Sequence, residues 1–295
     1  MKKCIIFVGA HSSSGELFAQ EINQYAQSMT YVLKRYSEVA IVIKDGKLSC
    51  VCLDDGSDIA DYDLIYLRGK TCEPLRHVLA LYAGQHHIPV VNSESNTFQV
   101  MSKIEQYAAL AVADIPVPDS AFVTDAGHYG RVPELLGADF PIVAKSILGS
   151  NGNDNVLVRT ADELQGVDLQ DPVFQPFLPN EFDYRVIVTG ERVALAYKRI
   201  RGVTSDDYKN NVAKGGRREM VELPDDVAAI AVKTARVVGR EFGGVDVLPR
   251  SDNGQLVVLE INFNFGTPQF DDLVRKDAYY RDVDEYFNGL TAASS

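Results

Sequence analysis

Two apolar runs near the C-terminal end of the chain carry oxygen-bearing side chains at positions where burial is expected. GGVDVL holds Asp246, and after the turn SDNG the run QLVVLEINFNFG holds Glu260 and Asn262. The turn makes the two runs neighbours in a hairpin, and the alternation of a strand directs Glu260 and Asn262 to one face. A buried carboxylate pair is costly unless a cation or hydrogen bonds compensate it. The hairpin therefore predicts a site for a hard cation such as Mg²⁺, with a solvated strand face as the alternative.

The first hundred residues alternate strand and helix signals, which predicts an α/β unit with a mainly parallel sheet. The predicted strands are CIIFVGA, DYDLIYLRG and IPVVNS. Helices are expected from Gly15 to about Met29 and from Glu73 to His86. Asp45-Gly46, between two β-rich runs, predicts a hairpin turn.

The rest of the chain mixes hairpins with helices. A helix is expected from Ser102 to Ala113, and FPIVAKSILGS and NVLVRT are expected strands. DYRVIVTGERVALAYKRI predicts a second hairpin with its turn at Gly190-Glu191, followed by a helix over Pro224–Phe242 and a closing helix in the last 25 residues. We expect three lobes, at residues 1–100, 101–172 and 173–295.

Length and charge exclude several classes. The 295 residues are 46% hydrophobic and carry a net charge of −12, which suits a globular protein and argues against a general nucleic-acid or anionic-membrane binder. No apolar run approaches the ~18 residues of a membrane helix. The apolar run near the N-terminus has only about five residues, whereas a signal peptide needs ~7–15, so we do not expect export. Cys4, Cys50, Cys52 and Cys72 lack zinc spacing, so we expect reduced, packed thiols in the cytoplasm.

A second feature is Lys145 at the end of a predicted strand, followed by the small-residue loop Gly149–Asp154. Glycines let backbone N–H groups approach a phosphate, and the lysine adds a positive charge. The loop matches neither GxxxxGK[ST] nor GxGxxG, and an ordinary hairpin loop is the alternative.

A third feature is the basic segment 198–218, which holds seven basic and two acidic residues and so carries +5 within a chain of −12. Its basic residues are Lys198, Arg199, Arg201, Lys209, Lys214, Arg217 and Arg218. We interpret it as a funnel for an anion; a solvated loop is the alternative.

In this order the three features resemble the ATP-grasp superfamily, and most closely its RimK-like carboxylate–amine ligases. The strings that carry the resemblance are DYRVIVTGERVALAYKRIRG, YKNNVAKGG, GVDVL and LEIN. The resemblance covers residues 100–268 and implies an α/β ATP-grasp fold. A Rossmann-like pre-ATP-grasp domain would precede two α+β lobes that enclose ATP.

The resemblance also implies roles for individual residues. Lys103 and Lys145 would contact the ATP phosphates, and the loop with Gly149, Ser150 and Gly152 would close over them. The hinge Gln175-Pro176-Phe177-Leu178 would contact the adenine edge, although Pro176 has no N–H to donate. Asp183 would lie on the ribose side, and Lys209, Asn210 and Asn211 would contact the triphosphate. Asp246, Glu260 and Asn262 would bind Mg²⁺, with two ions expected and Mn²⁺ as a substitute.

The implied reaction is amide or peptide bond formation through an acylphosphate, on an amino acid, small peptide or peptide tail. Arg199, Lys145 and Arg185 would act at the transferred phosphate. Arg68, His11 and Lys214 are candidates to bind the substrate, and for Arg68 a surface position beside Lys70 is the alternative. An ATP-grasp kinase and a non-catalytic ATP-binding regulatory module stay open as functions, as does a homo-oligomer.

Overall fold

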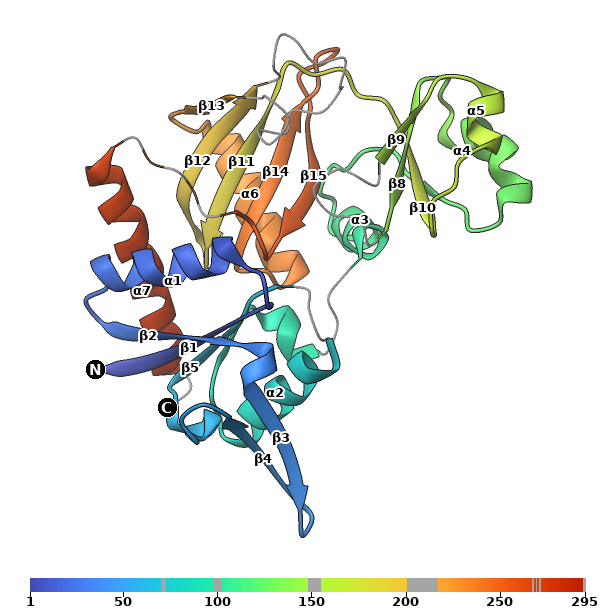
Figure 1. The fold of residues 1–295 in the computed structure, drawn as a ribbon. Helices are drawn as coiled ribbons and strands as arrows, with labels where there is room; N and C mark the ends of the chain where they lie inside the picture. Colours follow the sequence, from blue (N-terminus) through green and yellow to red (C-terminus); the bar gives the residue numbers. More distant parts are fainter. Residues whose placement is uncertain are drawn as a thin grey trace.

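The computed structural model describes residues 1–69, 73–97, 102–147, 155–200, 217–266, 268, 270 and 272–293. These residues build three larger sheets and one separate hairpin (Figure 1). Short 3₁₀ helices lie among them at η1 (Tyr36–Glu38), η2 (Ile59–Asp61), η3 (Ser93–Thr97) and η4 (Ala126–Arg131). No helix in these ranges is long and apolar enough to cross a membrane.

The N-terminal sheet is parallel, as predicted, with the strand order β2-β1-β5-β6. Its strands are β1 (Lys2–Val8), β2 (Met29–Arg35), β5 (Leu64–Leu67) and β6 (Val90–Val91). Alternate residues of β1 belong to two cores: Cys4 and Ile6 pack with α1 (Ser13–Tyr25), and Ile5 and Phe7 pack with α2 (Glu73–Gln85). The sheet is therefore covered on both faces, as parallel sheets usually are.

The prediction for α1 was too long, and β2 was missed. The helix ends at Tyr25 because Ala26 is extended, at φ −63° and ψ 139°. Asn23 then joins the helix to the next strand: its amide donates to the Tyr31 carbonyl at 2.8 Å and accepts from the Tyr31 N–H at 3.0 Å. These contacts connect residues eight apart, which helical spacing of apolar residues does not indicate.

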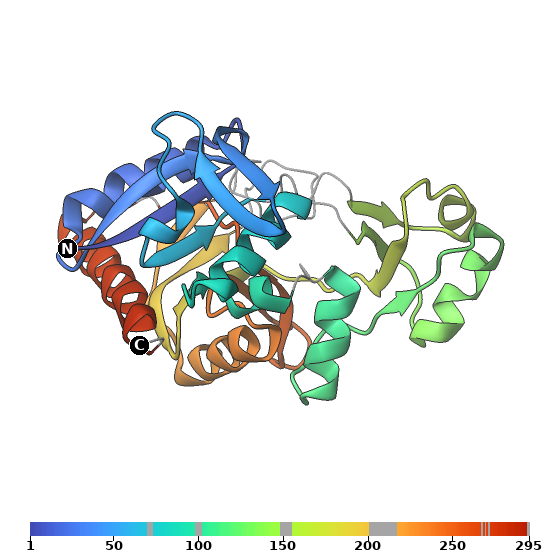
Figure 2. The same ribbon diagram turned by 90° about the horizontal axis from the view of Figure 1, so that it is seen from below.

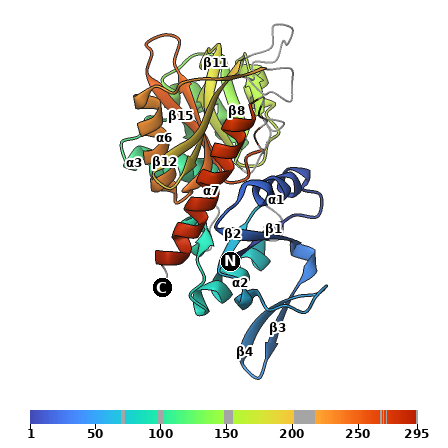
Figure 3. The ribbon, with the colours of Figure 1, turned by 90° about the vertical axis from the view of Figure 1, so that its left-hand side faces the viewer.

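The hairpin predicted at Asp45-Gly46 is confirmed, but it forms a sheet of its own. β3 (Val39–Lys44) pairs with β4 (Lys47–Cys52), and both turn residues have positive φ, at 49° and 72°. A two-residue turn of this kind matches the twist of the strands. Figures 1 and 3 show the hairpin projecting away from the rest of the molecule.

The second sheet is antiparallel, in the order β7-β10-β8-β9. Its strands are β7 (Ala121–Phe122), β8 (Ile142–Ser146), β9 (Asn155–Val158) and β10 (Pro172–Pro176), packed against α4 (Val132–Leu136) and α5 (Ala161–Gln165). α3 (Lys103–Val112) comes before this sheet in the chain and lies between it and the third sheet, as Figure 2 shows from below.

The third sheet has five antiparallel strands in the order β13-β12-β11-β14-β15. They are β11 (Phe182–Thr189), β12 (Arg192–Ile200), β13 (Arg217–Met220), β14 (Phe242–Pro249) and β15 (Leu256–Asn262). Both predicted hairpins are present. α6 (Asp225–Val238) covers one face through a valine-rich core. It is shorter than predicted, because Gly239 ends it at φ 71° and Phe242 already belongs to β14.

α7 (Leu273–Ala293) brings the C-terminal part of the chain into contact with the N-terminal part. It packs on α1 and on β12, and Tyr280 stacks on Tyr25 at 5.6 Å between ring centroids. Asp284 accepts hydrogen bonds from Tyr31 Oη at 2.7 Å and from the backbone of Gln27 and Ser28. The C-terminal helix thus fixes the N-terminal sheet against the open face of the third sheet.

Candidate active site

The face of the third sheet opposite α6 carries a row of charged side chains. In the strand register Asp246 lies opposite Glu260, Arg185 lies opposite Asp246, and Arg199 lies opposite Asp183. The sequence predicted the first of these relations from the β14–β15 turn. The other two place both expected catalytic arginines beside the expected metal ligands.

Four of these residues form one ion-pair network. Arg185 makes a two-point contact with Asp246, its Nε donating to Oδ1 and its Nη2 to Oδ2, the latter at 3.0 Å. Arg199 donates from Nη2 to Asp246 Oδ2 at 2.8 Å and from Nε to Asp183 Oδ1 at 2.6 Å. All four side chains are nearly buried. The network therefore fixes the positions of both arginines before any ligand binds.

Burial and neighbouring charges have opposite effects on the pKa values of Asp183 and Arg199. Burial raises the pKa of Asp183 above its ordinary value, although the Arg199 guanidinium opposes this. Burial also disfavours the charge on Arg199, but Asp246 and Asp183 outweigh it and raise the Arg199 pKa well above normal. Arg199 therefore stays a cation throughout the working pH range.

The expected metal ligands lie together at the β15 side of the network. The Asn262 amide donates from Nδ2 to Glu260 Oε1 at 2.7 Å, so the amide oxygen of Asn262 faces away from that bond. Each carboxylate oxygen has two acceptor positions, so Asp246 can serve two arginines and still reach a cation. Two carboxylates and an amide oxygen are hard ligands, and this donor set fits Mg²⁺.

Side chains of other elements hold the backbone of β15 between the two ligands. The Ile261 N–H donates to Gln106 Oε1 at 3.1 Å, and the Ile261 carbonyl accepts from Arg240 Nη1. Tyr107 Oη donates to the Leu259 carbonyl at 2.8 Å. β15 is an edge strand, so these contacts satisfy backbone groups that a further strand would otherwise pair.

Sequence reasoning missed Gln106, Tyr107 and Arg240. The only available signal was the capping box at Ser102 and Glu105, which sets the start of α3 and hence the face on which Gln106 and Tyr107 lie. Nothing in the sequence pointed to Arg240, which also pairs with the buried Glu94 at 2.6 Å.

The two expected phosphate-binding lysines lie on α3 and on the second sheet. Lys103, at the first turn of α3, donates from Nζ to the Ser146 carbonyl at 3.1 Å. Lys145 lies on β8, and desolvation lowers its pKa to about 8; Glu260 opposes this effect and Lys103 adds to it. Lys145 is thus electrostatically coupled to a residue of the third sheet. Lys145 is therefore close enough to both Glu260 and Lys103 for their charges to interact.

The expected adenine hinge spans the last two residues of β10 and the two residues after it. Gln175 is buried and donates from Nε2 to Ser120 Oγ at 2.8 Å. The Phe177 N–H donates to the Pro141 carbonyl at 3.0 Å, so this donor is already used. Pro176, Phe177 and Leu178 are half-buried.

The remaining expected residues differ in outcome. Gly149, Ser150, Gly152, Lys209, Asn210, Asn211 and Lys214 lie outside the described residues. His11 is exposed in the turn after β1. The surface alternative for Arg68 is wrong: its side chain is completely buried, because it reaches inward to the Phe265 carbonyl at 2.8 Å.

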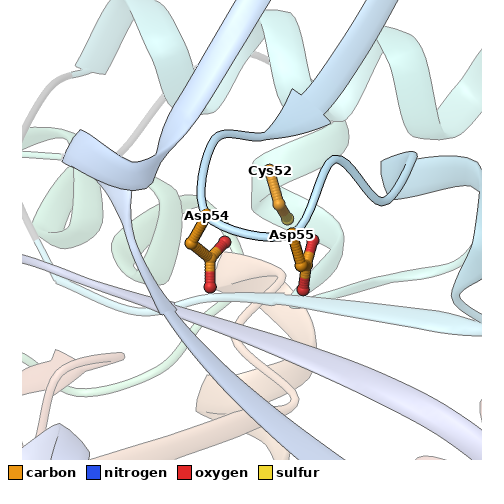
Figure 4. Close-up of side chains that lie close together, drawn as sticks. All are labelled: Cys52, Asp54 and Asp55. Atoms are coloured by element: carbon orange, nitrogen blue, oxygen red, sulfur yellow. The ribbon is translucent and has the colours of Figure 1, made fainter.

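A second acidic cluster lies at the end of the β3–β4 hairpin, away from this face. Cys52 is the last residue of β4, and Asp54 and Asp55 lie close to it in the turn that follows (Figure 4). Lys34 Nζ contacts Asp54 at 2.6 Å and Asp55 at 2.8 Å, so one lysine already bridges the two carboxylates and compensates one of their two charges. Burial raises the pKa of Cys52, and Cys4, Cys50 and Cys52 are buried free thiols, as expected. Cys72 lies outside the described residues.

Comparison with known families decides the assignment. The model of the RimK-like ATP-grasp domain matches residues 100–281, which is more than half of the chain. The chain belongs to the RimK-like ATP-grasp family. The predicted family is confirmed, and with it the class of activity, an ATP-dependent ligase that forms carbon–nitrogen bonds.

Two relatives illustrate the family. A probable alpha-L-glutamate ligase of Mannheimia succiniciproducens is 28% identical over 222 residues, covering 70% of this chain and 71% of the relative. A tetrahydromethanopterin:alpha-L-glutamate ligase of Methanocaldococcus jannaschii is 27% identical over 190 residues, covering 60% and 62%.

Solved structures confirm the ATP-grasp fold. The ATP-grasp ligase PsnB, in complex with minimal precursor, Mg and ADP, matches with a TM-score of 0.68 and 18% identity, covering 99% of this chain and 97% of PsnB. A RiPP-associated ATP-grasp ligase of Chryseobacterium gregarium, in complex with ADP and a leader and core peptide, matches with a TM-score of 0.68 and 16% identity, covering 97% and 96%.

Proposed function

We propose that this chain activates a carboxylate of an amino acid or peptide with ATP and joins the acyl group to an amine. The carboxylate oxygen attacks the γ-phosphorus in line, which gives an acylphosphate and ADP. The amine then attacks the acyl carbon, and inorganic phosphate leaves from the tetrahedral intermediate. The observation that carries the proposal is the Arg185–Asp246–Arg199–Asp183 network, which lies beside Glu260 and Asn262, with Lys145 close enough to Glu260 and Lys103 for their charges to interact.

The lysines and the hinge would bind the nucleotide. Lys103 and Lys145 would contact phosphate oxygens, together with Gly149, Ser150, Gly152, Lys209, Asn210 and Asn211 by resemblance to the family. In the hinge, Pro176 has no N–H and the Phe177 N–H is already bonded, so Leu178 is the donor that we propose for the adenine edge.

Asp246, Glu260 and Asn262 would hold Mg²⁺. The PsnB complex contains Mg with ADP, which supports this cation; two ions and replacement by Mn²⁺ are part of the proposal. When bound, the cation would neutralise negative charge on phosphate oxygens and orient them. Gln106, Tyr107 and Arg240 would keep β15, and hence its ligands, in register with β14.

The arginines would stabilise charge at the reacting centre. Arg199 is held by two aspartates, so its guanidinium is fixed in place and needs little reorganisation during the reaction. Arg185 is held by Asp246 in the same way. Both would offer their remaining N–H groups to the transferred phosphate and to the acyl oxygen.

We also propose three lobes, at residues 1–100, 101–172 and 173–295. β10 (Pro172–Pro176) pairs with β8, which supports placing the second boundary a few residues later. The buried free thiols of Cys4, Cys50 and Cys52 support a reducing, cytoplasmic location.

The test is ADP release by the purified protein with Mg²⁺ and ATP. A matrix of amino acids and short peptides would be offered as carboxylate and amine partners, with mass spectrometry on each reaction. The proposal expects ADP release that depends on both partners and a product one water lighter than their sum. ADP release that does not depend on the added carboxylate would contradict the proposal.

A further inference from the structure

Arg68 is a completely buried cation whose hydrogen bonding is incomplete. Its Nη2 donates to Ser14 Oγ at 3.0 Å and to the Phe265 carbonyl at 2.8 Å. Its guanidinium also lies over the Phe18 ring at 5.1 Å. Nε and Nη1, both buried, have no acceptor among the described residues. Buried donors without a partner are rare in folded proteins and destabilise them, so these two call for an explanation.

Arg218, on the charged face, also has buried N–H groups without an acceptor among the described residues. It lies on β13 directly opposite Arg199, and its guanidinium lies over the Tyr197 ring at 5.4 Å. Its Nε and Nη1 are buried without an acceptor in the described ranges. The residue as a whole is only partly exposed, which makes it the more accessible of the two arginines.

Tyr279 of α7 shares a hydrophobic core with residues that contact each arginine. It packs in one core with Tyr197, over which Arg218 lies, and with Phe265, to which Arg68 is bonded. Arg68 and Tyr197 both influence the pKa of Tyr279, which burial raises. The hydroxyls of Tyr279 and Tyr280 are buried and lack a partner in the part of the chain that the structure describes. Arg68, Arg218 and Tyr279 form what we call the arginine–tyrosine cluster.

The other two arginines of the charged face have carboxylate partners. Arg185 and Arg199 each donate from Nε and Nη2 to the carboxylates of Asp183 and Asp246, so their charge is compensated inside the protein. An anionic substrate therefore gains more from the arginine–tyrosine cluster, where buried N–H and O–H groups have no acceptor, than from the network. Carboxylate oxygens are acceptors only, and they complement this set of donors.

We propose that Arg68, Arg218 and Tyr279 bind a substrate carboxylate other than the one that reacts; this inference rests on the proposed function. Arg68 donates to the carbonyl of Phe265, three residues after the expected ligand Asn262, and Arg218 lies opposite Arg199 in the strand register. Both arginines therefore adjoin segments that carry residues of the candidate site. A permanent cation suits a group that stays ionised. Equally tight binding of the reacting carboxylate would stabilise the ground state and slow its phosphorylation.

The experiment uses the acid–amine pair with the highest turnover in the ADP-release matrix. Each carboxyl group of the pair is replaced in turn by a carboxamide, and kcat/KM is measured for wild type, Arg218→Met and Tyr279→Phe. The carboxamide that abolishes turnover marks the reacting carboxyl. Another carboxamide should lower wild-type kcat/KM by ~10–100-fold, the range expected for lost charge-assisted hydrogen bonds. With the free acid, both variants should show the kcat/KM that wild type shows with the carboxamide. With the carboxamide, the kcat/KM of both variants should equal that of wild type.

Arg236→Met is the matched control, because Arg236 lies on α6, which covers the other face of the third sheet, and its side chain is 64% exposed. It should keep the wild-type preference. Arg68→Lys should retain part of the preference, and unchanged Mg²⁺-ADP binding shows that each variant is folded. Full preference for the acid in Arg218→Met and Tyr279→Phe would overturn the inference and leave the ligase proposal intact. No carboxylate-dependent ADP release in wild type would overturn both.

Discussion

Arg185 and Asp246 lie directly opposite each other on β11 and β14, and their side chains form a buried two-point ion pair. Asp246 also accepts from Arg199, so one carboxylate positions both arginines of the charged face. The arrangement explains how two guanidinium groups can be held still in a site that must also accept a triphosphate.

Removing one partner of this pair should destabilise the fold. Arg185→Met leaves Asp246 buried with one of its two cations missing, and we expect a loss of about 3–5 kcal/mol in the free energy of unfolding. Urea denaturation measures it. The double variant Arg185→Met/Asp246→Leu should recover part of the loss, since no uncompensated charge stays buried. An Arg185→Met protein as stable as wild type would show that the pair is not buried in solution.

Lys145 should make nucleotide binding depend on pH. Its pKa in the free protein is about 8, below the ordinary 10.5, so it loses its proton as the pH rises through 8. Nucleotide phosphates favour the charged form, so binding above pH 8 should take up a proton and weaken as the pH rises. Calorimetric titration with Mg²⁺-ADP at pH 8.5, in buffers of different ionisation enthalpy, measures the uptake. Lys145→Arg should show none, and equal uptake in that variant would assign the proton elsewhere.

Glu260→Gln should abolish turnover and keep the fold. The amide oxygen that this substitution introduces can still accept from Asn262, but it lacks the charge that a divalent cation needs. Loss of a residue that only supports a metal ligand costs ~10–100-fold, so loss of the ligand itself should cost at least about 100-fold in kcat/KM. ADP release and circular dichroism test the two parts. Turnover at the wild-type rate would refute the metal assignment.

Gln106 should matter through β15 and not through contact with a ligand. Gln106→Leu leaves the buried Ile261 N–H without an acceptor, at a cost of about 1–3 kcal/mol. Because Ile261 lies between Glu260 and Asn262, the Mg²⁺ concentration for half-maximal activity should rise. Val112→Gln, on the same helix and 88% exposed, is the control and should change neither value. A Gln106→Leu enzyme with normal Mg²⁺ dependence would limit Gln106 to a role in stability.

The sequence was most informative where neighbouring residues determine the structure. The turn after β14 set Asp246 opposite Glu260, and Asp45-Gly46 placed the β3–β4 hairpin. The order of the sequence motifs along the chain then identified the family. The two hairpin inferences rest on residues within about 15 positions of one another, where turn chemistry and strand alternation determine the geometry.

Contacts between distant segments were not predictable in the same way. Arg68 follows a strand as a surface residue would, yet it is buried because Phe265, about two hundred residues later, packs over it. The support of β15 by Gln106 and Arg240 depends on how α3 and the end of α6 pack on the third sheet. β2 was missed because the helix before it ends without glycine or proline and is closed by Asn23.

The most direct test of the proposed ligase is hydroxylamine trapping of the acylphosphate. Purified protein is incubated with Mg²⁺, ATP, hydroxylamine and the carboxylate partner alone, and the hydroxamate is measured by mass spectrometry beside ADP. We predict a hydroxamate of the carboxylate partner that requires ATP and is absent with Glu260→Gln. A stable phosphate ester with no hydroxamate would contradict the account and indicate a kinase, and ATP binding without turnover would indicate a regulatory module.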